Sequence, residues 1–128
     1  MMRPRANLET DRLVLDELEP ADADEMVEWR NWIVRRREDR RAVGTVEATI
    51  IDGGRTASIA WIVGRPWQGR GFATEAVRVI VGWLDDRGVQ RIVASVHPDH
   101  RASAGVASAA GLRPTDESVE GERVWSKG

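Results

Sequence analysis

The chain has 128 residues and a formal net charge of −2, with 19 basic and 21 acidic side chains. The length favours a single domain over residues 1–128, and the charge supplies no global basic field for nucleic acid or an anionic membrane surface. The lack of cysteine excludes disulfides, thiolate catalysis and the common zinc sites. No apolar run is long enough for a signal peptide or a membrane span, so we expect a cytoplasmic protein.

The first part of the chain reads mostly as strands. Residues 12–19 alternate apolar and polar side chains and predict a strand. Pro20 opens residues 21–29, where acidic residues in the first turn predict a short helix. Residues 31–37 and 41–51 predict two more strands, separated by a charged turn.

A hairpin and a long amphipathic helix follow. Residues 51–56 contain Asp-Gly and Gly-Gly, which tolerate the positive φ of tight hairpin turns. Residues 57–64 are almost continuously apolar and predict a strand buried on both faces. Apolar residues at helical spacing predict a helix over residues 72–87, with Gly88 at its C-terminal cap.

The last part alternates strand and helix. Residues 89–98 predict a strand, and residues 99–111 predict an alanine-rich helix with Asp99 as N-cap and Gly111 as its stop. Residues 112–125 predict two short strands around a turn at Glu120–Gly121. The order indicates an α/β fold with a mixed, mostly antiparallel sheet flanked by helices, and at least one strand–helix–strand crossover.

The stretch Gly64–Ala76, a loop that runs into the start of the long helix, has a composition suited to an anion. A glycine-rich turn that leads into a helix N-terminus presents several backbone N–H groups beside the positive end of the helix dipole. Gly69 and Gly71 allow close approach of the backbone to a ligand, and Arg65 and Arg70 could neutralise its charge. The alternative is an ordinary turn with solvated arginines.

Two common phosphate-binding motifs do not fit this loop. A Walker loop ends in Gly-Lys-Ser/Thr, whereas this loop continues Gly71-Phe72-Ala73-Thr74. A dinucleotide fingerprint would need a third glycine where Thr74 stands, and an acidic residue about 20 positions further on, where a strand is expected. A dinucleotide-binding oxidoreductase fragment is therefore the least favoured of the functions that we consider for this sequence.

The segment Gln68-Gly69-Arg70-Gly71-Phe72-Ala73 resembles the Q/R-x-x-G-x-G/A motif of the GNAT acyltransferase superfamily. The stretch 96–115 resembles the strand and helix that follow in this family. Residues 7–15 resemble the start of its RimJ/RimL-like branch. The likeness covers residues 7–20 and residue 32 to the end. Two ordered motifs at the right separation are more specific than one loop.

The resemblance implies an acyl-CoA site with acetyl-CoA as co-substrate. Amides from Gly69 to Thr74 would hold the pyrophosphate, and Ile62 and Val63 would pair with pantetheine where their strand parts from residues 91–96. His100 stands where many relatives carry asparagine, and Ser103 matches the family serine near the thioester sulfur. The cofactor-binding set it implies is Ile62, Val63, Gln68, Gly69, Arg70, Gly71, Phe72, Ala73, Thr74 and His100.

The implied reaction is direct transfer of the acetyl group to a primary amine of a small molecule or protein. An alkyl amine has a pKa of about 10.4, so its proton must be removed near neutral pH. With no tyrosine in the chain, Ser103 is the candidate acid for the departing thiolate. Glu47 and His100 are the candidate bases, although Glu47 could be solvated and His100 could cap the helix. His97, Asp99 and His100 lack further nearby ligands, so we expect no metal.

The chain departs from the family pattern before its second strand. Relatives carry two helices there, which form one wall of the acceptor site. Here only "ADADEMVEWR" is available, as if a segment were deleted near Val27–Glu28. Two consequences are expected: the uncovered sheet face would favour a homodimer, and a catalytically silent CoA-binding module is the alternative to an active acetyltransferase. The acceptor itself is not assigned by the sequence.

Overall fold

The computed structural model describes residues 5–19 and 27–128, and these residues form one eight-stranded sheet and two α-helices. The strands are β1 (Leu8–Glu9), β2 (Leu13–Glu17), β3 (Val27–Arg36), β4 (Ala42–Ile51), β5 (Thr56–Val63), β6 (Arg91–Val96), β7 (Arg113–Val119) and β8 (Glu122–Lys127). The helices are α1 (Phe72–Asp86) and α2 (Arg101–Ala109), with short 3-10 turns η1 (Asp52–Gly54) and η2 (Arg65–Trp67).

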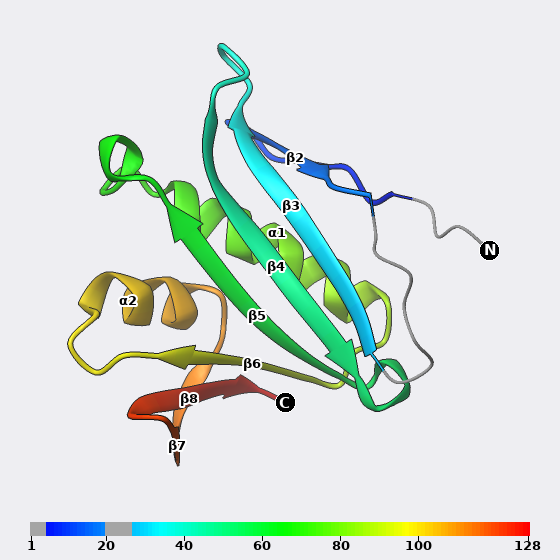
Figure 1. Cartoon of the computed structure of the whole chain (residues 1–128), viewed down its shortest axis with the longest axis vertical. Coiled ribbons are helices and arrows are strands. Elements are labelled where there is room, and N and C mark those ends of the chain that lie inside the picture. Colours follow the sequence, from blue (N-terminus) through cyan, green and yellow to red (C-terminus); the bar gives the residue numbers. More distant parts are fainter. Residues whose placement is uncertain (1–4, 20–26) are drawn as a thin grey trace.

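The sheet order is β1-β2-β3-β4-β5-β6-β8-β7. Every neighbouring pair is antiparallel except β5 and β6, which α1 connects as a crossover. This confirms the mixed, mostly antiparallel α/β fold. In Figure 1, α1 lies behind β4 and β5, while α2 stands beside β5 and β6, and the two helices contact each other.

One hydrophobic core joins the sheet and both helices. The α1 residues at helical spacing, including Ala76, Ile80 and Leu84, are buried against even-numbered β4 residues such as Val46 and Ala48. The alternation along β4 leaves Thr45, Glu47 and Thr49 on the opposite face of the sheet, because successive strand residues point to opposite sides. Predicted elements that place this core, including β2, β4, α1 and the β7–β8 hairpin, are confirmed.

Three expectations need correction. The prediction that the strand over residues 57–64 is buried on both faces is wrong. In β5, Ala57 and Ile59 are buried, whereas the other face, with Ser58, Ala60 and Ile62, is exposed. The helix expected over residues 21–29 is wrong at its end, because residues 27–29 belong to β3, and residues 20–26 lie outside the described part. The proposed deletion point, Val27–Glu28, therefore lies inside β3.

The N-cap of α2 is also not the expected one. His100 occupies this position, with φ −94° and ψ 76°, and Asp99 precedes it. The backbone N–H of Asp99 instead donates to His97 Nδ1 at 3.1 Å, which fixes a short turn before the helix. Strand β1 was not expected at all, because two residues are too short to produce a periodic pattern.

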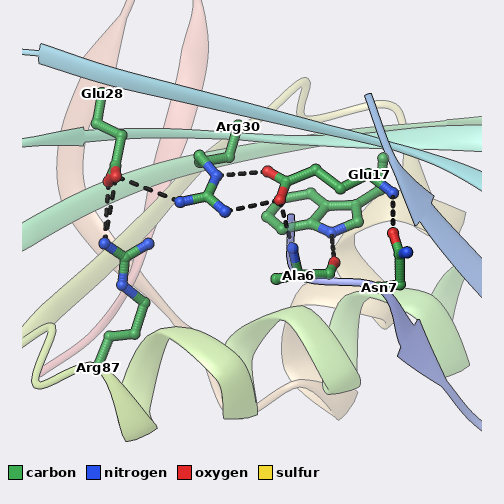
Figure 2. Close-up of polar contacts among 7 residues, drawn as sticks. Ala6, Asn7, Glu17, Glu28, Arg30 and Arg87 are labelled. Carbon is green, nitrogen blue, oxygen red and sulfur yellow. Dashed lines mark hydrogen bonds and ion pairs between the residues drawn. The ribbon is translucent and has the colours of Figure 1, made fainter. Parts of the chain in front are cut away.

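A buried charged cluster lies at the C-terminal end of α1, and we call it the Glu17–Arg87 network (Figure 2). Arg30 makes a two-pronged contact with the Glu17 carboxylate and also reaches Glu28 Oε1 at 3.4 Å. Arg87, just past α1, binds both oxygens of Glu28 at 3.1 and 3.2 Å. The side chains of Glu17, Glu28 and Arg30 are at most 8% exposed. Buried charges are costly unless they are paired, and here two carboxylates are matched by two guanidinium groups.

The network also ties down the start of the described chain. Glu17 accepts the Ala6 N–H through Oε1 and donates its own backbone N–H to Asn7 Oδ1, as Figure 2 shows. Trp32 Nε1 donates to the Ala6 carbonyl at 2.7 Å. Burial is the largest influence on Arg87 and, together with the nearby Arg30, lowers its pKa. Within the described residues, no buried side-chain nitrogen or oxygen lacks a hydrogen-bond partner.

Candidate active site

The site begins where β5 and β6 part. Their parallel pairing runs from Thr56–Arg91 to Ser58–Val93 and then stops, although β5 continues to pair with β4 up to Gly44–Val63. From Ile59 onward, the β6-facing edge of β5 therefore has no partner strand within the described part of the chain. This parting opens a gap inside the sheet rather than at its rim.

A cavity of about 350 Å³ lies at this gap, and we call it the first cavity. The end of β5, the loop before α1, the first turn of α1 and the start of α2 enclose it. Its lining consists of Trp61, Ile62, Val63, Trp67, Gln68, Gly69, Gly71, Phe72, Ala73, Thr74, His100, Ala102, Ser103 and Val106. The cavity is largely apolar along the strand and presents backbone amides at the loop.

The loop supplies an uncapped helix start. Gly71 is the N-cap of α1 with φ 81°, a left-handed conformation that favours glycine, and no side chain caps the helix among the described residues. The first backbone bond of the helix runs from Glu75 N–H to the Gly71 carbonyl, so the preceding amides at the start of α1 face the loop side. Gln68 Nε2 donates to the Val63 carbonyl at 3.0 Å and holds the loop against β5.

Gly44 keeps the end of β5 in place from the other side. A Cβ atom at this position would stand 2.1 Å from the Ile62 carbonyl oxygen, a distance that no real contact allows. The two strands approach so closely here because Gly44 pairs with Val63 at the last rung of the β4–β5 ladder. Any side chain at residue 44 would push Ile62 and Val63 out of the cavity wall.

Three guanidinium groups surround Trp67 beside the cavity. Arg36 lies 4.6 Å from the centre of the indole ring, and Arg41 and Arg70 lie 5.3 Å from it. Arg36 also pairs with Asp39, but among the described residues no carboxylate lies within ion-pair distance of Arg41 or Arg70. The charge near Trp67 is therefore available to an anionic ligand.

Glu75 anchors the first turn of α1 to the start of β2. Its carboxylate accepts hydrogen bonds from the Thr10 hydroxyl, from the side-chain Nε of Arg12 and from the backbone N–H of Arg12. Partial burial alone would raise the pKa of Glu75, but these hydrogen bonds and the Arg12 charge outweigh it and lower the pKa. Arg12 Nη1 also donates to the Arg70 carbonyl at 2.9 Å, so this contact fixes the loop.

His100 and Ser103 meet at the floor of the first cavity. Ser103 Oγ and His100 Nδ1 are 2.8 Å apart, one turn of α2 from each other. Both side chains line the cavity, and Ser103 is half-buried. The pair can relay a proton, because a hydroxyl bonded to an imidazole can donate to a neighbouring anion and be reprotonated.

The structure brings together most of the residues singled out from the sequence. Ile62, Val63, Gln68, Gly69, Gly71, Phe72, Ala73, Thr74, His100 and Ser103 all line the first cavity. Two do not: Arg70 stacks on Trp67 outside the lining, and Glu47 lies on the exposed face of β4, opposite Ala60 of β5. Trp61, Ala102 and Val106 also line the cavity; the last two were missed because small apolar helix residues carry no chemical signal.

No helix among the described residues has the length and apolar character needed to cross a membrane. The described residues also contain no group of three or more His, Asp or Glu side chains arranged to hold a metal ion.

The family profile described as an acetyltransferase (GNAT) domain matches residues 26–113. A protein from Bordetella pertussis assigned to the GNAT acetyltransferases aligns over 97% of this chain and 100% of its own, with 20% identity and a TM-score of 0.75. The structure of the microcin C7 self-immunity acetyltransferase MccE with acetyl-CoA and AMP aligns over 77% of this chain and 60% of its own, with 24% identity and a TM-score of 0.66.

The RimL ribosomal L7/L12 α-N-protein acetyltransferase, solved with coenzyme A, aligns over 80% of this chain and 62% of its own, with 16% identity and a TM-score of 0.66. The chain thus spans less than two thirds of the length of both of these enzymes, but the whole length of the Bordetella protein. At these identities the likeness to solved structures concerns the fold. No functionally curated protein matches the chain.

Proposed function

The chain belongs to the GNAT acetyltransferase family, and from this premise we propose that it transfers an acetyl group from acetyl-CoA to a primary amine. The observation that carries the proposal is the first cavity. It joins an uncapped helix start, a strand edge without a partner and a Ser103–His100 pair in one space of about 350 Å³.

The parts of acetyl-CoA fit the parts of this cavity by their chemistry. The pyrophosphate suits the amides at Gly69–Thr74 and the positive end of α1, since a helix N-terminus stabilises anions. Pantetheine carries amide groups that suit the unpaired edge of β5 at Ile62 and Val63. The Val63 carbonyl already accepts Gln68 Nε2, so pantetheine would use the remaining lone pair or displace that side chain.

The transfer step needs one proton removed and one supplied. The neutral amine attacks the thioester carbonyl carbon, a C–N bond forms, the C–S bond breaks, and the thiolate takes up a proton. Ser103 is placed to donate that proton with His100 behind it, because their 2.8 Å contact lies in the cavity wall. Glu47 is proposed as a base acting from the open face of the sheet, beside Ala60.

A silent CoA-binding module is the second candidate. It is favoured by the absence of tyrosine in the chain and by the short connection between Glu17 of β2 and Val27 of β3. Such a protein would bind acetyl-CoA and CoA without releasing thiol in the presence of amines. A RimJ/RimL-like role with a protein acceptor remains an extension of the same proposal, supported only by the start of the sequence and by fold likeness.

Calorimetric titration with acetyl-CoA, CoA and NAD tests the binding part. We expect acetyl-CoA and CoA to bind, and NAD to bind at least tenfold more weakly. Gly71→Val should lower CoA affinity at least tenfold, because a β-branched residue at φ 81° is strained and its Cβ would approach Arg12 Nη2 at 3.3 Å. Gly82→Ala is the control, because this helix position has open space and the variant should bind normally.

Thiol release with a panel of primary amines tests the transfer part. The chain contains no cysteine, so a thiol reagent detects only CoA. Release of CoA that depends on the amine supports the acetyltransferase. Tight binding without release would leave the silent module, and NAD affinity above CoA affinity would overturn both.

A further inference from the structure

A second cavity of about 190 Å³ adjoins the first. The two share Trp61, His100 and Ser103, so they meet at the Ser103–His100 pair. The second cavity extends between the parted ends of β5 and β6, past Ala60 and Ser95, both of which are exposed. A molecule in the second cavity would therefore reach the same reacting point as a ligand in the first, from another side.

Among the described residues, Glu122 is the acidic residue in the lining of the second cavity, and no Arg or Lys lines it. Glu122 begins β8, one residue before Arg123, which pairs with Val96 of β6. The tight turn with positive φ at Glu120 and Gly121 fixes its position, and the side chain is half-buried. Glu122 thus lines the second cavity next to the end of β6, together with His97.

His97 cannot take the role of this carboxylate in its neutral form. Its Nδ1 accepts the Asp99 backbone N–H, so the ring proton resides on Nε2 and the free ring edge donates. His100 Nδ1 is engaged by Ser103 Oγ. Glu122 is therefore the lining residue that is suited to bind a cationic group.

We propose that Glu122 binds the ammonium group of the acceptor and so selects small cationic amines for this site. The proposal rests on the proposed function, because it names the substrate class and its anchor. An alkyl amine is protonated near neutral pH, and a carboxylate in a partly enclosed space attracts it more strongly than in bulk water. The bound ammonium then loses one proton to the proposed base, Glu47, opposite Ala60 in the cavity lining, and the neutral amine attacks the thioester carbonyl next to Ser103.

An NMR titration tests this with two probes of equal size and different charge, 1-aminobutane and 1-butanol. Each is added to protein saturated with CoA, for the unaltered chain, Glu122→Gln and Glu120→Gln. The last is a matched control, since Glu120 lies in the same turn but outside the cavity lining. We expect the unaltered chain to bind the amine at least tenfold more tightly than the alcohol, and Glu122→Gln to weaken amine binding about fivefold or more.

Binding of 1-butanol should not change in Glu122→Gln, and Glu120→Gln should match the unaltered chain. Equal effects of the two substitutions, equal binding of the two probes, or no amine binding would each overturn the proposal. Failure of CoA to bind would count against the proposed function instead. The amine titration is then run without CoA, where the difference between the Glu122 and Glu120 variants still decides the role of Glu122.

Discussion

The two ends of α1 use arginine in opposite ways. At the C-terminal end, Arg30 and Arg87 are matched by Glu17 and Glu28 in a buried network that ties β2, β3 and the helix together. At the N-terminal end, Arg41 and Arg70 stack on Trp67 with no carboxylate at ion-pair distance among the described residues. Charge held in close ion pairs serves the fold, and charge without such a close pair beside a cavity is available to a ligand.

The largest expected effect comes from breaking the matched end. Arg30→Met leaves the fully buried Glu17 carboxylate without its cation, which should lower the free energy of unfolding by about 3–5 kcal/mol. Urea unfolding followed by circular dichroism measures this. CoA affinity of the folded fraction should stay unchanged, because the network lies at the far end of α1 from the loop.

The double variant Glu17→Gln/Arg30→Met separates charge from packing. With both charges removed, the loss should be smaller than for Arg30→Met alone, because no uncompensated carboxylate remains. An equal or larger loss in the double variant would mean that packing against Trp83, 5.0 Å from Arg30, matters more than the ion pair.

A smaller effect is expected at the unmatched end. Trp67→Ala removes the ring on which three guanidinium groups stack and should weaken CoA binding of the folded protein about five- to tenfold. Because Trp67 also packs against the core, the unfolding free energy should fall as well, but by less than for Arg30→Met. Calorimetric titration measures the affinity. Trp29→Ala is the control, because Trp29 is 43% exposed and does not line the first cavity. Equal weakening in both variants would contradict a specific role for Trp67.

The smallest effect concerns pH and Glu75. The pKa of this carboxyl is lowered in the folded chain, so the ionised form stabilises the fold above the usual glutamate pKa of about 4.3. That contribution is lost as the pH falls below about 4.3 and through the lowered pKa. Melting temperatures between pH 7 and pH 3 should therefore decline less steeply for Glu75→Gln. Parallel curves for the two proteins would contradict this.

Much of the fold follows from local patterns in the sequence. The alternation in β2 and β4, the helical spacing in α1 and the turn residues at Gly88, Gly111 and Gly121 each specify an element without long-range information. β5 was misjudged because small and apolar side chains such as Ala60 and Ile62 stand on its exposed face, beside the gap. An apolar run does not reveal which neighbour a strand lacks.

In the candidate site, too, residues of a contiguous motif were predicted, and residues brought in by strand pairing were missed. The glycine-rich loop is a contiguous motif, so its residues were predicted together, and most of them line the first cavity. Glu122 was not predicted, because it joins the lining of the second cavity only through the pairing of β8 with β6. Gly44 was missed for a similar reason: its need for a bare backbone arises from Ile62 on the next strand. Side chains assembled by sheet pairing leave no local signal.

The place where β5 and β6 part also bears on aggregation. An unpaired strand edge can recruit a strand from another molecule, and proteins usually protect their outer edges with proline, charge or short strands. Here β1 is only two residues long, and the outer strand β7 carries Pro114 and charged residues such as Asp116 and Glu117. The unpaired edge of β5 lies between two strands of its own sheet, so the chain can offer free backbone groups to a cofactor without exposing them at the rim to other copies of itself.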